Sequence, residues 1–269
     1  DIASGRVKEL ALRLETDRIH ARPKRVTASA STNSVVLGPT GKRVLIEARG
    51  QIVSVPVTEG ASRLLAPLPG TRSQYPAWSR DGKSAAFVSD RSGEDQVWIV
   101  SADGMDTPRQ LTKDHQGPLG EIKWSPDGKS LVIFDREMRI LLVETATGAV
   151  TLVDQGEVGG SYDSVNYSAV YSPDGKWLAF HRTESNLNRA VYLYDIAGKK
   201  KIAVTSPHLN AYSPFWDPEG KLLYFLADRQ FDPQGTNLTK FFTFDRTAKI
   251  TFVVLAADGN STRTAVSLG

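Results

Sequence analysis

Short apolar runs recur along the chain, and each is bounded by polar residues and glycine. The runs cover residues 84–88, 131–134, 177–180 and 222–226. They are rich in aromatic and β-branched residues, which favours short strands buried on both faces. No segment has the pattern of a convincing helix, so the sequence predicts an all-β protein.

A turn motif with the order aromatic, Ser or Asp, Pro, Asp or Glu, Gly, Lys precedes each run. Its copies, the first of them degenerate, occupy residues 37–42, 78–83, 124–129, 171–176 and 216–221. Proline presets φ for a β-turn, aspartate bonds nearby backbone, and glycine adopts a positive φ. Each motif is therefore expected to join two antiparallel strands. The motif glycines stand at positions 41, 82, 128, 175 and 220, so the repeat is 41 to 47 residues long.

Two further strands are predicted after each buried run. The third strands cover 51–56, 96–101, 139–144 and 191–195, and more polar fourth strands cover 63–65, 109–112, 150–153 and 202–205. Stacked repeats of four antiparallel strands are typical of a β-propeller. A β-sandwich of unrelated hairpins would not explain one turn motif at a near-constant period. We therefore expect four-stranded blades, with the aromatic residues of the motif packed between them: Trp78, Trp124, Tyr171 and Trp216.

The two ends of the chain bear on whether the ring closes. Residues 1–10 resemble 195–202, a predicted turn between third and fourth strands, so the chain is expected to begin inside a blade. The stretch 239–255 contains strand-like runs that could complete that blade and bring the total to about six. We interpret 1–269 as one propeller domain that was excised from a longer chain. Its blades could belong to a larger ring. An open ring exposes strand edges, which predicts a marginal or homo-oligomeric isolated domain.

Composition narrows the classes of function. The net charge is +3, and the charges are interspersed except for Lys199-Lys200-Lys201 in a predicted turn, whereas nucleic-acid surfaces need clustered cations. The absence of cysteine excludes disulfides and a cysteine nucleophile. No apolar run has the length of a membrane-spanning helix. We expect neither nucleic-acid binding nor membrane insertion, and the compartment, cytoplasm or bacterial periplasm, stays open.

Motifs for catalysis or cofactor binding are not found in the sequence. A serine-hydrolase elbow requires Gly-x-Ser-x-Gly, and no such string occurs. Gly41-Lys42 lacks the flanking residues of a phosphate-binding loop. The histidines are far apart in the sequence and fall mostly near predicted loops: His20, His115, His181 and His208. We assign no catalytic, cofactor-binding or metal-ligating residue.

Several stretches resemble a known family. Residues 75–94 are similar to the propeller repeats of both TolB and tricorn-type serine proteases. Residues 41–56, which contain Glu47-Ala48-Arg49-Gly50, and residues 213–229 resemble blades of the tricorn type. Phe231-Asp232-Pro233 resembles an insertion of that family. The resemblance covers nearly the whole chain in order and implies a β-propeller.

The resemblance also implies a role without catalysis. The propellers of tricorn-type proteases are thought to guide peptides toward, or products away from, a catalytic core. The family's catalytic serine, histidine and glutamate have no matching positions here. We expect a domain that gates peptides beside other domains of a parent serine peptidase. The alternatives are a TolB-like periplasmic propeller that docks a protein partner, although the small α/β domain of TolB is not found, and a propeller enzyme with acids or histidines converging in its channel.

Propellers usually bind ligands at the central channel, through loops that lead into the innermost strands. The polar and aromatic residues expected there are Arg72, Gln74, Glu121, Asn166, Tyr167, Asn210 and Tyr212. This mixture suits a backbone-rich ligand such as a peptide. The alternative is that these side chains only hydrate the channel. Glu121 is the one clear acid among them, which disfavours a propeller enzyme.

Overall fold

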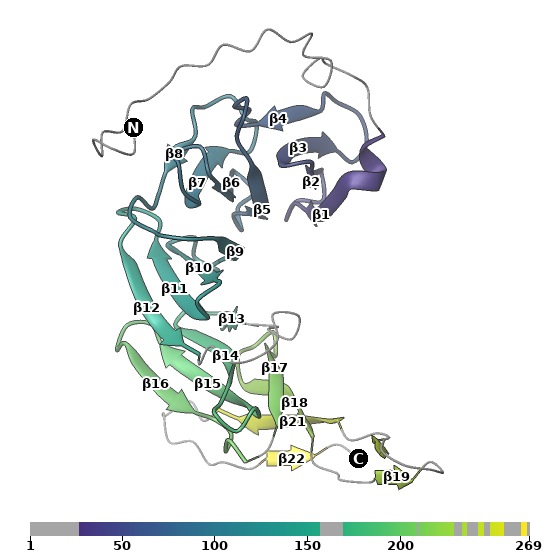
Figure 1. The fold of residues 1–269 in the computed structure, drawn as a ribbon, viewed down its shortest axis with the longest axis vertical. Helices are drawn as coiled ribbons and strands as arrows, with labels where there is room; N and C mark the ends of the chain where they lie inside the picture. The colour runs from purple at the N-terminus through teal and green to yellow at the C-terminus, as the bar shows by residue number, and fades with distance from the viewer. Residues whose placement is uncertain are drawn as a thin grey trace, which may run out of the picture.

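The computed structural model describes residues 27–156, 169–208, 210–228, 233–235, 242–244, 248–255 and 265–267. These residues form five four-stranded antiparallel sheets, which lie side by side as blades along a curved arc (Figure 1). The other described elements are a short 3₁₀ helix, η2 (Ala28–Ser31), and a hairpin of β19 (Pro233–Gly235) and β20 (Phe242–Phe244). The prediction of an all-β propeller is therefore confirmed.

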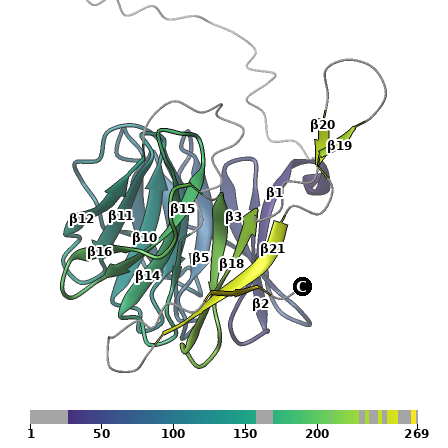
Figure 2. The ribbon, with the colours of Figure 1, turned by 90° about the horizontal axis from the view of Figure 1, so that it is seen from below.

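Within each blade the strands follow chain order from the concave to the convex side of the arc (Figure 1). The first blade is β1 (Thr32–Leu37), β2 (Arg43–Ala48), β3 (Gln51–Pro56) and β4 (Arg63–Leu65), and the second is β5 (Ser73–Trp78), β6 (Ser84–Ser89), β7 (Gln96–Ser101) and β8 (Arg109–Gln110). The third is β9 (Leu119–Trp124), β10 (Ser130–Asp135), β11 (Arg139–Glu144) and β12 (Val150–Gln155), and the fourth is β13 (Ala169–Tyr171), β14 (Trp177–Thr183), β15 (Arg189–Asp195) and β16 (Lys200–Ala203). The fifth is β17 (Ala211–Trp216), β18 (Leu222–Asp228), β21 (Ala248–Val254) and β22 (Ala265–Ser267). The inner strands run along the axis of the arc (Figure 2).

The core consists of apolar layers between neighbouring blades. Phe87 of the second blade shares one apolar cluster with Leu45 of the first. Leu131 of the third blade shares another with Val97 of the second, and Phe180 of the fourth a further one with Val132 of the third. The second strands of these middle blades are buried on both faces, as the sequence predicts. Burial between blades is therefore what holds the arc together, since each blade offers an apolar face to the next.

The end blades differ from the predicted pattern of two buried faces. Buried and half-buried residues alternate along β18 and along most of β2. The first and fifth blades lie at the two ends of the arc (Figure 1), so each has one neighbouring blade among the described residues. Their inner strands, β1 and β17, carry apolar side chains that solvent reaches: Val35 and Leu37 are 63% and 61% exposed, and Phe215 is 64% exposed.

The C-terminal strands complete the fifth blade. We expected residues 239–255 to supply strands for a further, terminal blade. Within that stretch, β21 pairs along its whole length with β18, and β22 then pairs with β21. This happens because the fifth blade, like the others, needs a third and a fourth strand. The N-terminal residues 1–26, in which we expected the rest of the terminal blade, lie outside the described residues.

The turn motifs have the hydrogen bonds that their chemistry predicts. In the second blade, Gly82 donates its N–H to Ser79 O at 2.9 Å, and Gly82 has a φ of 68°. The hydroxyl of Ser79 donates to Asp81 Oδ1 at 2.6 Å, and the same carboxylate oxygen accepts the N–H of Lys83 at 3.0 Å. Ser125 with Asp127, and Ser172 with Asp174, repeat this arrangement in the next two blades.

These aspartates predict how stability depends on pH. Hydrogen bonds from Ser79 and from the backbone of Lys83 lower the pKa of Asp81. Burial works against the charged forms of Asp127 and Asp174, but hydrogen bonds from the serine and lysine of each turn outweigh it and lower their pKa. Because the folded pKa lies below the unfolded one, this stabilisation is complete above the unfolded pKa and is lost as pH falls through the folded pKa.

We therefore expect the urea midpoint to fall as the pH drops from neutrality to below about 4, the ordinary range of aspartate. The measurement is urea unfolding followed by circular dichroism across that range. The variant Asp127→Asn keeps an acceptor oxygen but cannot titrate, so it should show a shallower decline. An identical decline in the variant and the native chain would contradict the assignment.

Candidate functional site: the inner groove

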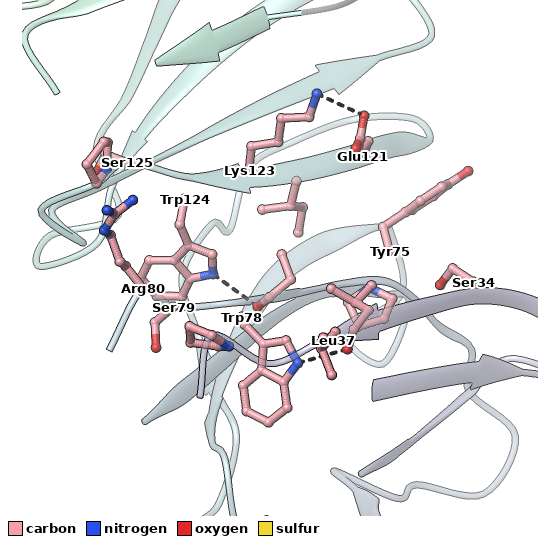
Figure 3. Close-up of a pocket in the computed structure, with 16 residues that line it drawn as sticks. Ser34, Leu37, Tyr75, Trp78, Ser79, Arg80, Glu121, Lys123, Trp124 and Ser125 are labelled. Atoms are coloured by element: carbon pink, nitrogen blue, oxygen red, sulfur yellow. Dashed lines mark hydrogen bonds and ion pairs between the residues drawn. The ribbon is translucent and has the colours of Figure 1, made fainter. Parts of the chain in front are cut away.

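A groove of about 510 Å³ lies along the concave side of the first three blades (Figure 3). It is lined by the inner strands β1, β5 and β9 and by the turns that follow them. A second groove, of about 460 Å³, continues across β9, β13 and β17. The residues common to both grooves are Arg80, Lys123, Trp124 and Pro126. We call the two together the inner groove.

Tryptophans of the turn motif form the floor of the inner groove and join the blades. The indole Nε1 of Trp124 donates to Ala77 O of the preceding blade at 3.0 Å, and Trp78 donates to Val36 O at 3.0 Å (Figure 3). Trp216 donates to Val170 O at 3.3 Å. Where the motif has Tyr171 instead, its hydroxyl lies 3.1 Å from Ser130 Oγ of the preceding blade. The predicted packing of these aromatics between blades is therefore confirmed.

Tyr75 enters the groove through an irregularity in β5. The register with β6 shifts between Gln74 and Ala77, and Tyr75 has a φ of 52° although Pro76 follows it. Such a φ is uncommon outside glycine and needs support from the surrounding structure. The support comes from Glu47 of the preceding blade, whose Oε2 accepts the N–H of Tyr75 at 2.9 Å.

Glu47 is a buried carboxylate that the sequence analysis did not single out as a site residue. Its side chain also accepts hydrogen bonds from Asn33 Nδ2 at 3.0 Å and Ser34 Oγ at 3.3 Å. Buried acceptors need such partners, because an unpaired one loses its hydration without compensation. The fifth blade has a counterpart, in which Ser213, with a φ of 53°, donates its N–H to His181 Nδ1 of the fourth blade at 3.3 Å.

Three charged side chains face the groove of the first three blades. Lys123 pairs with Glu121 at 3.5 Å between Nζ and Oε2 (Figure 3). Arg80 has no salt bridge or hydrogen bond of its side chain with any residue that the structure describes. Figure 3 shows Arg80 beside Trp124, with its guanidinium directed toward Ser125. Arg80 is exposed, and among the described residues that line this groove it is the charged side chain that has no ionic partner.

Of the predicted channel residues, some lie in or near the groove, some are engaged with neighbouring side chains, and some lie outside the described residues. Glu121 lines the groove, as expected, and Gln74 lies half-buried on β5 outside its lining. Arg72 and Asn210 precede the inner strands but are engaged in structural bonds: Arg72 pairs with Asp95 at 3.5 Å, and Asn210 Nδ2 donates to Asp228 Oδ2 at 2.6 Å. The guanidinium of Arg189 lies 3.9 Å from the ring centroid of Tyr212. Asn166 and Tyr167 lie outside the described residues.

The residues that the sequence analysis missed are Tyr75, Arg80 and Lys123. One signal for Arg80 was available, because it occupies the position where the other turn motifs have Pro39, Pro126, Pro173 and Pro218. No signal marked Tyr75, since only the bulge in β5 turns it into the groove. The described residues contain no group of three or more His, Cys, Asp or Glu arranged to hold a metal ion. Nor does this part of the chain contain a helix long and apolar enough to cross a bilayer.

Repeated four-stranded blades with a groove along their inner strands define this chain as a β-propeller. The family described as "Tricorn protease second beta propeller domain" matches residues 32–266. The chain belongs to this family. The tricorn-type interpretation of the sequence is therefore confirmed.

Individual relatives agree with this assignment. Tricorn protease homolog 1 of Streptomyces coelicolor is 28% identical over 262 residues, which are 96% of this chain and 24% of that protein. A crystal structure of the tricorn protease superposes with a TM-score of 0.72 at 18% identity, over 90% of this chain and 24% of that one. TolB from Acinetobacter baumannii superposes with a TM-score of 0.50 at 18% identity, over 88% of this chain and 54% of that one. The chain thus spans about a quarter of the tricorn relatives, and the TolB-like alternative is less favoured.

Proposed function

We propose that this chain is a non-catalytic propeller wall of a larger serine protease, and that peptides pass along its inner groove. Family membership and the continuous groove across the inner strands support the proposal. Peptides on their way to or from a catalytic core, and other domains of such a protease, are the partners that this role requires.

The groove has the chemistry that an extended peptide uses. Each inner strand is hydrogen-bonded within its sheet on one side only, so part of its main chain faces the groove. Extended peptides bind such edges through main-chain hydrogen bonds, with pockets for alternate side chains. Tyr75 and Trp124 supply aromatic surface, which binds apolar side chains without demanding one sequence. This combination suits the passage of many peptides better than the recognition of one.

The experiment that tests the proposal uses the absence of cysteine from the sequence. Leu37 lines the groove and is 61% exposed, whereas Leu152 is 51% exposed on the outermost strand of the third blade. Leu37→Cys and Leu152→Cys are each labelled with an environment-sensitive fluorophore and titrated with short unstructured peptides. We expect the label at position 37 to respond and the matched label at 152 to stay silent. Equal responses, or none at millimolar peptide, would contradict the proposal.

A further inference from the structure

Arg80 breaks the repeat at one position only. The other four turn motifs have proline there, and three of those prolines pack on the motif glycine of the next blade: Pro39 on Gly82, Pro126 on Gly175 and Pro173 on Gly220. A side-chain carbon added at each of these glycines would meet the proline at 3.2 to 3.5 Å. At Gly128, which follows Arg80 by one blade, nothing lies within 4 Å. Arginine at position 80 therefore forgoes a contact between blades that proline makes elsewhere.

The positive charge of Arg80 forms no ion pair with a residue that the structure describes. Asp81, the neighbouring carboxylate, is held by Ser79 and by the N–H of Lys83. Glu121 is paired with Lys123, and Asp217 of the second groove accepts the N–H groups of Glu219 and Leu222. The acids that line the inner groove are thus already engaged. Arg80 lines both parts of that groove without such a partner.

We propose that Arg80 binds a carboxylate of a peptide lying in the inner groove, a step that rests on the function proposed above. A guanidinium offers two parallel N–H donors to the two oxygens of a carboxylate. Lys123 also lines both grooves, but its charge is paired with Glu121, so Arg80 is the group that offers an unpaired positive charge to the ligand. Both the C-terminal carboxylate and the side chains of Asp and Glu have this chemistry. Trp124 and Pro126, common to both grooves, provide apolar surface for the residues next to that carboxylate.

The test measures the affinity of dye-labelled short peptides for the full chain by fluorescence anisotropy at low salt. The probes share one apolar sequence and differ in one feature: a free C-terminal carboxylate, a C-terminal amide, or a C-terminal amide with one internal glutamate. We expect the free acid to bind about 3- to 10-fold more tightly than the plain amide, as for a partly exposed charged pair. The advantage should shrink at high salt because mobile ions screen the pair. If the probe with the internal glutamate binds more tightly than the plain amide, side-chain carboxylates also bind Arg80.

Three variants decide whether Arg80 is responsible. Arg80→Gln should reduce the affinity for the free-acid peptide to that for the amide peptide. Arg80→Pro restores the residue of the other motifs, so it should remain folded and lose the same preference. Lys176→Gln removes an exposed positive charge from the turn of the fourth blade and should keep the preference. Circular dichroism melting confirms that each variant is folded.

Two outcomes overturn the carboxylate proposal and leave the peptide groove standing: equal binding of acid and amide by the native chain, or a preference that survives in both Arg80 variants. If Lys176→Gln lost the preference for the free acid to the same extent, the preference would follow from net charge alone, and the carboxylate proposal would also be overturned. If no probe binds, and the label at position 37 is silent, then the proposed function itself fails.

Discussion

Replacing Trp124 by alanine is expected to lower the free energy of unfolding by about 2–4 kcal/mol, since large aromatic truncations in cores cost about 3–5 kcal/mol and this side chain is only partly buried. The indole packs against the apolar layer between the second and third blades and donates its N–H to Ala77 O. Removing it loses apolar burial, opens a cavity and leaves that carbonyl without its partner. The measurement is urea unfolding followed by circular dichroism, with the slope checked for constancy.

Two companion variants separate the causes. Trp124→Phe keeps a ring but removes the N–H, and should cost about 1 kcal/mol for the lost hydrogen bond plus a smaller packing change. Leu152→Ala truncates a half-exposed residue on the outermost strand β12 and should stay within about 0.5 kcal/mol of the native chain. If Trp124→Ala destabilised the chain no more than Leu152→Ala does, the indole would not join the blades.

Replacing Gly148 by alanine should lower the free energy of unfolding by about 2–5 kcal/mol. Gly148 lies in the turn between β11 and β12 with a φ of 78°, a conformation that costs other residues about 1–2 kcal/mol. Its turn packs on the preceding blade, so a Cβ atom would overlap with Leu111 O. Relieving that overlap requires backbone movement, which adds about 1–3 kcal/mol.

Gly128→Ala is the matched control. Gly128 has a φ of 73°, but nothing lies within 4 Å of the position of its Cβ. It should therefore lose only the conformational part, about 1–2 kcal/mol. The difference between the two urea midpoints isolates the close approach of the third blade to the second. Equal losses would show that the blades move apart at little cost.

Much of the fold could be predicted because the relevant interactions are local. The Ser-Pro-Asp-Gly chemistry of residues 125–128 closes its turn with bonds between residues at most five apart. The predicted third strands 51–56, 96–101 and 139–144 have the bounds of β3, β7 and β11. Their place after the first hairpin of each repeat and before a turn was sufficient because a blade is a meander of consecutive strands.

The candidate site was predicted less well. Arg72 and Asn210 occupy the loops where a propeller binds ligands, yet both are engaged by carboxylates of their surroundings, Asp95 and Asp228. Tyr75 and Arg80, by contrast, reach the groove. A side chain is available to a ligand only if its neighbours leave it unpaired, and those neighbours come from strands that are distant in the sequence.

The sequence by itself therefore determined the repeat, the strand order and the all-β class, since turn chemistry and short apolar runs act over a few residues. Only the tertiary structure decided which faces remain uncovered at the ends of the arc, as the half-exposed alternation of β18 shows. It also decided that the bulge supported by Glu47 turns Tyr75 into the groove and that Arg80 finds no partner there among the described residues. These features depend on contacts between blades, and such contacts exist only once the repeats are stacked.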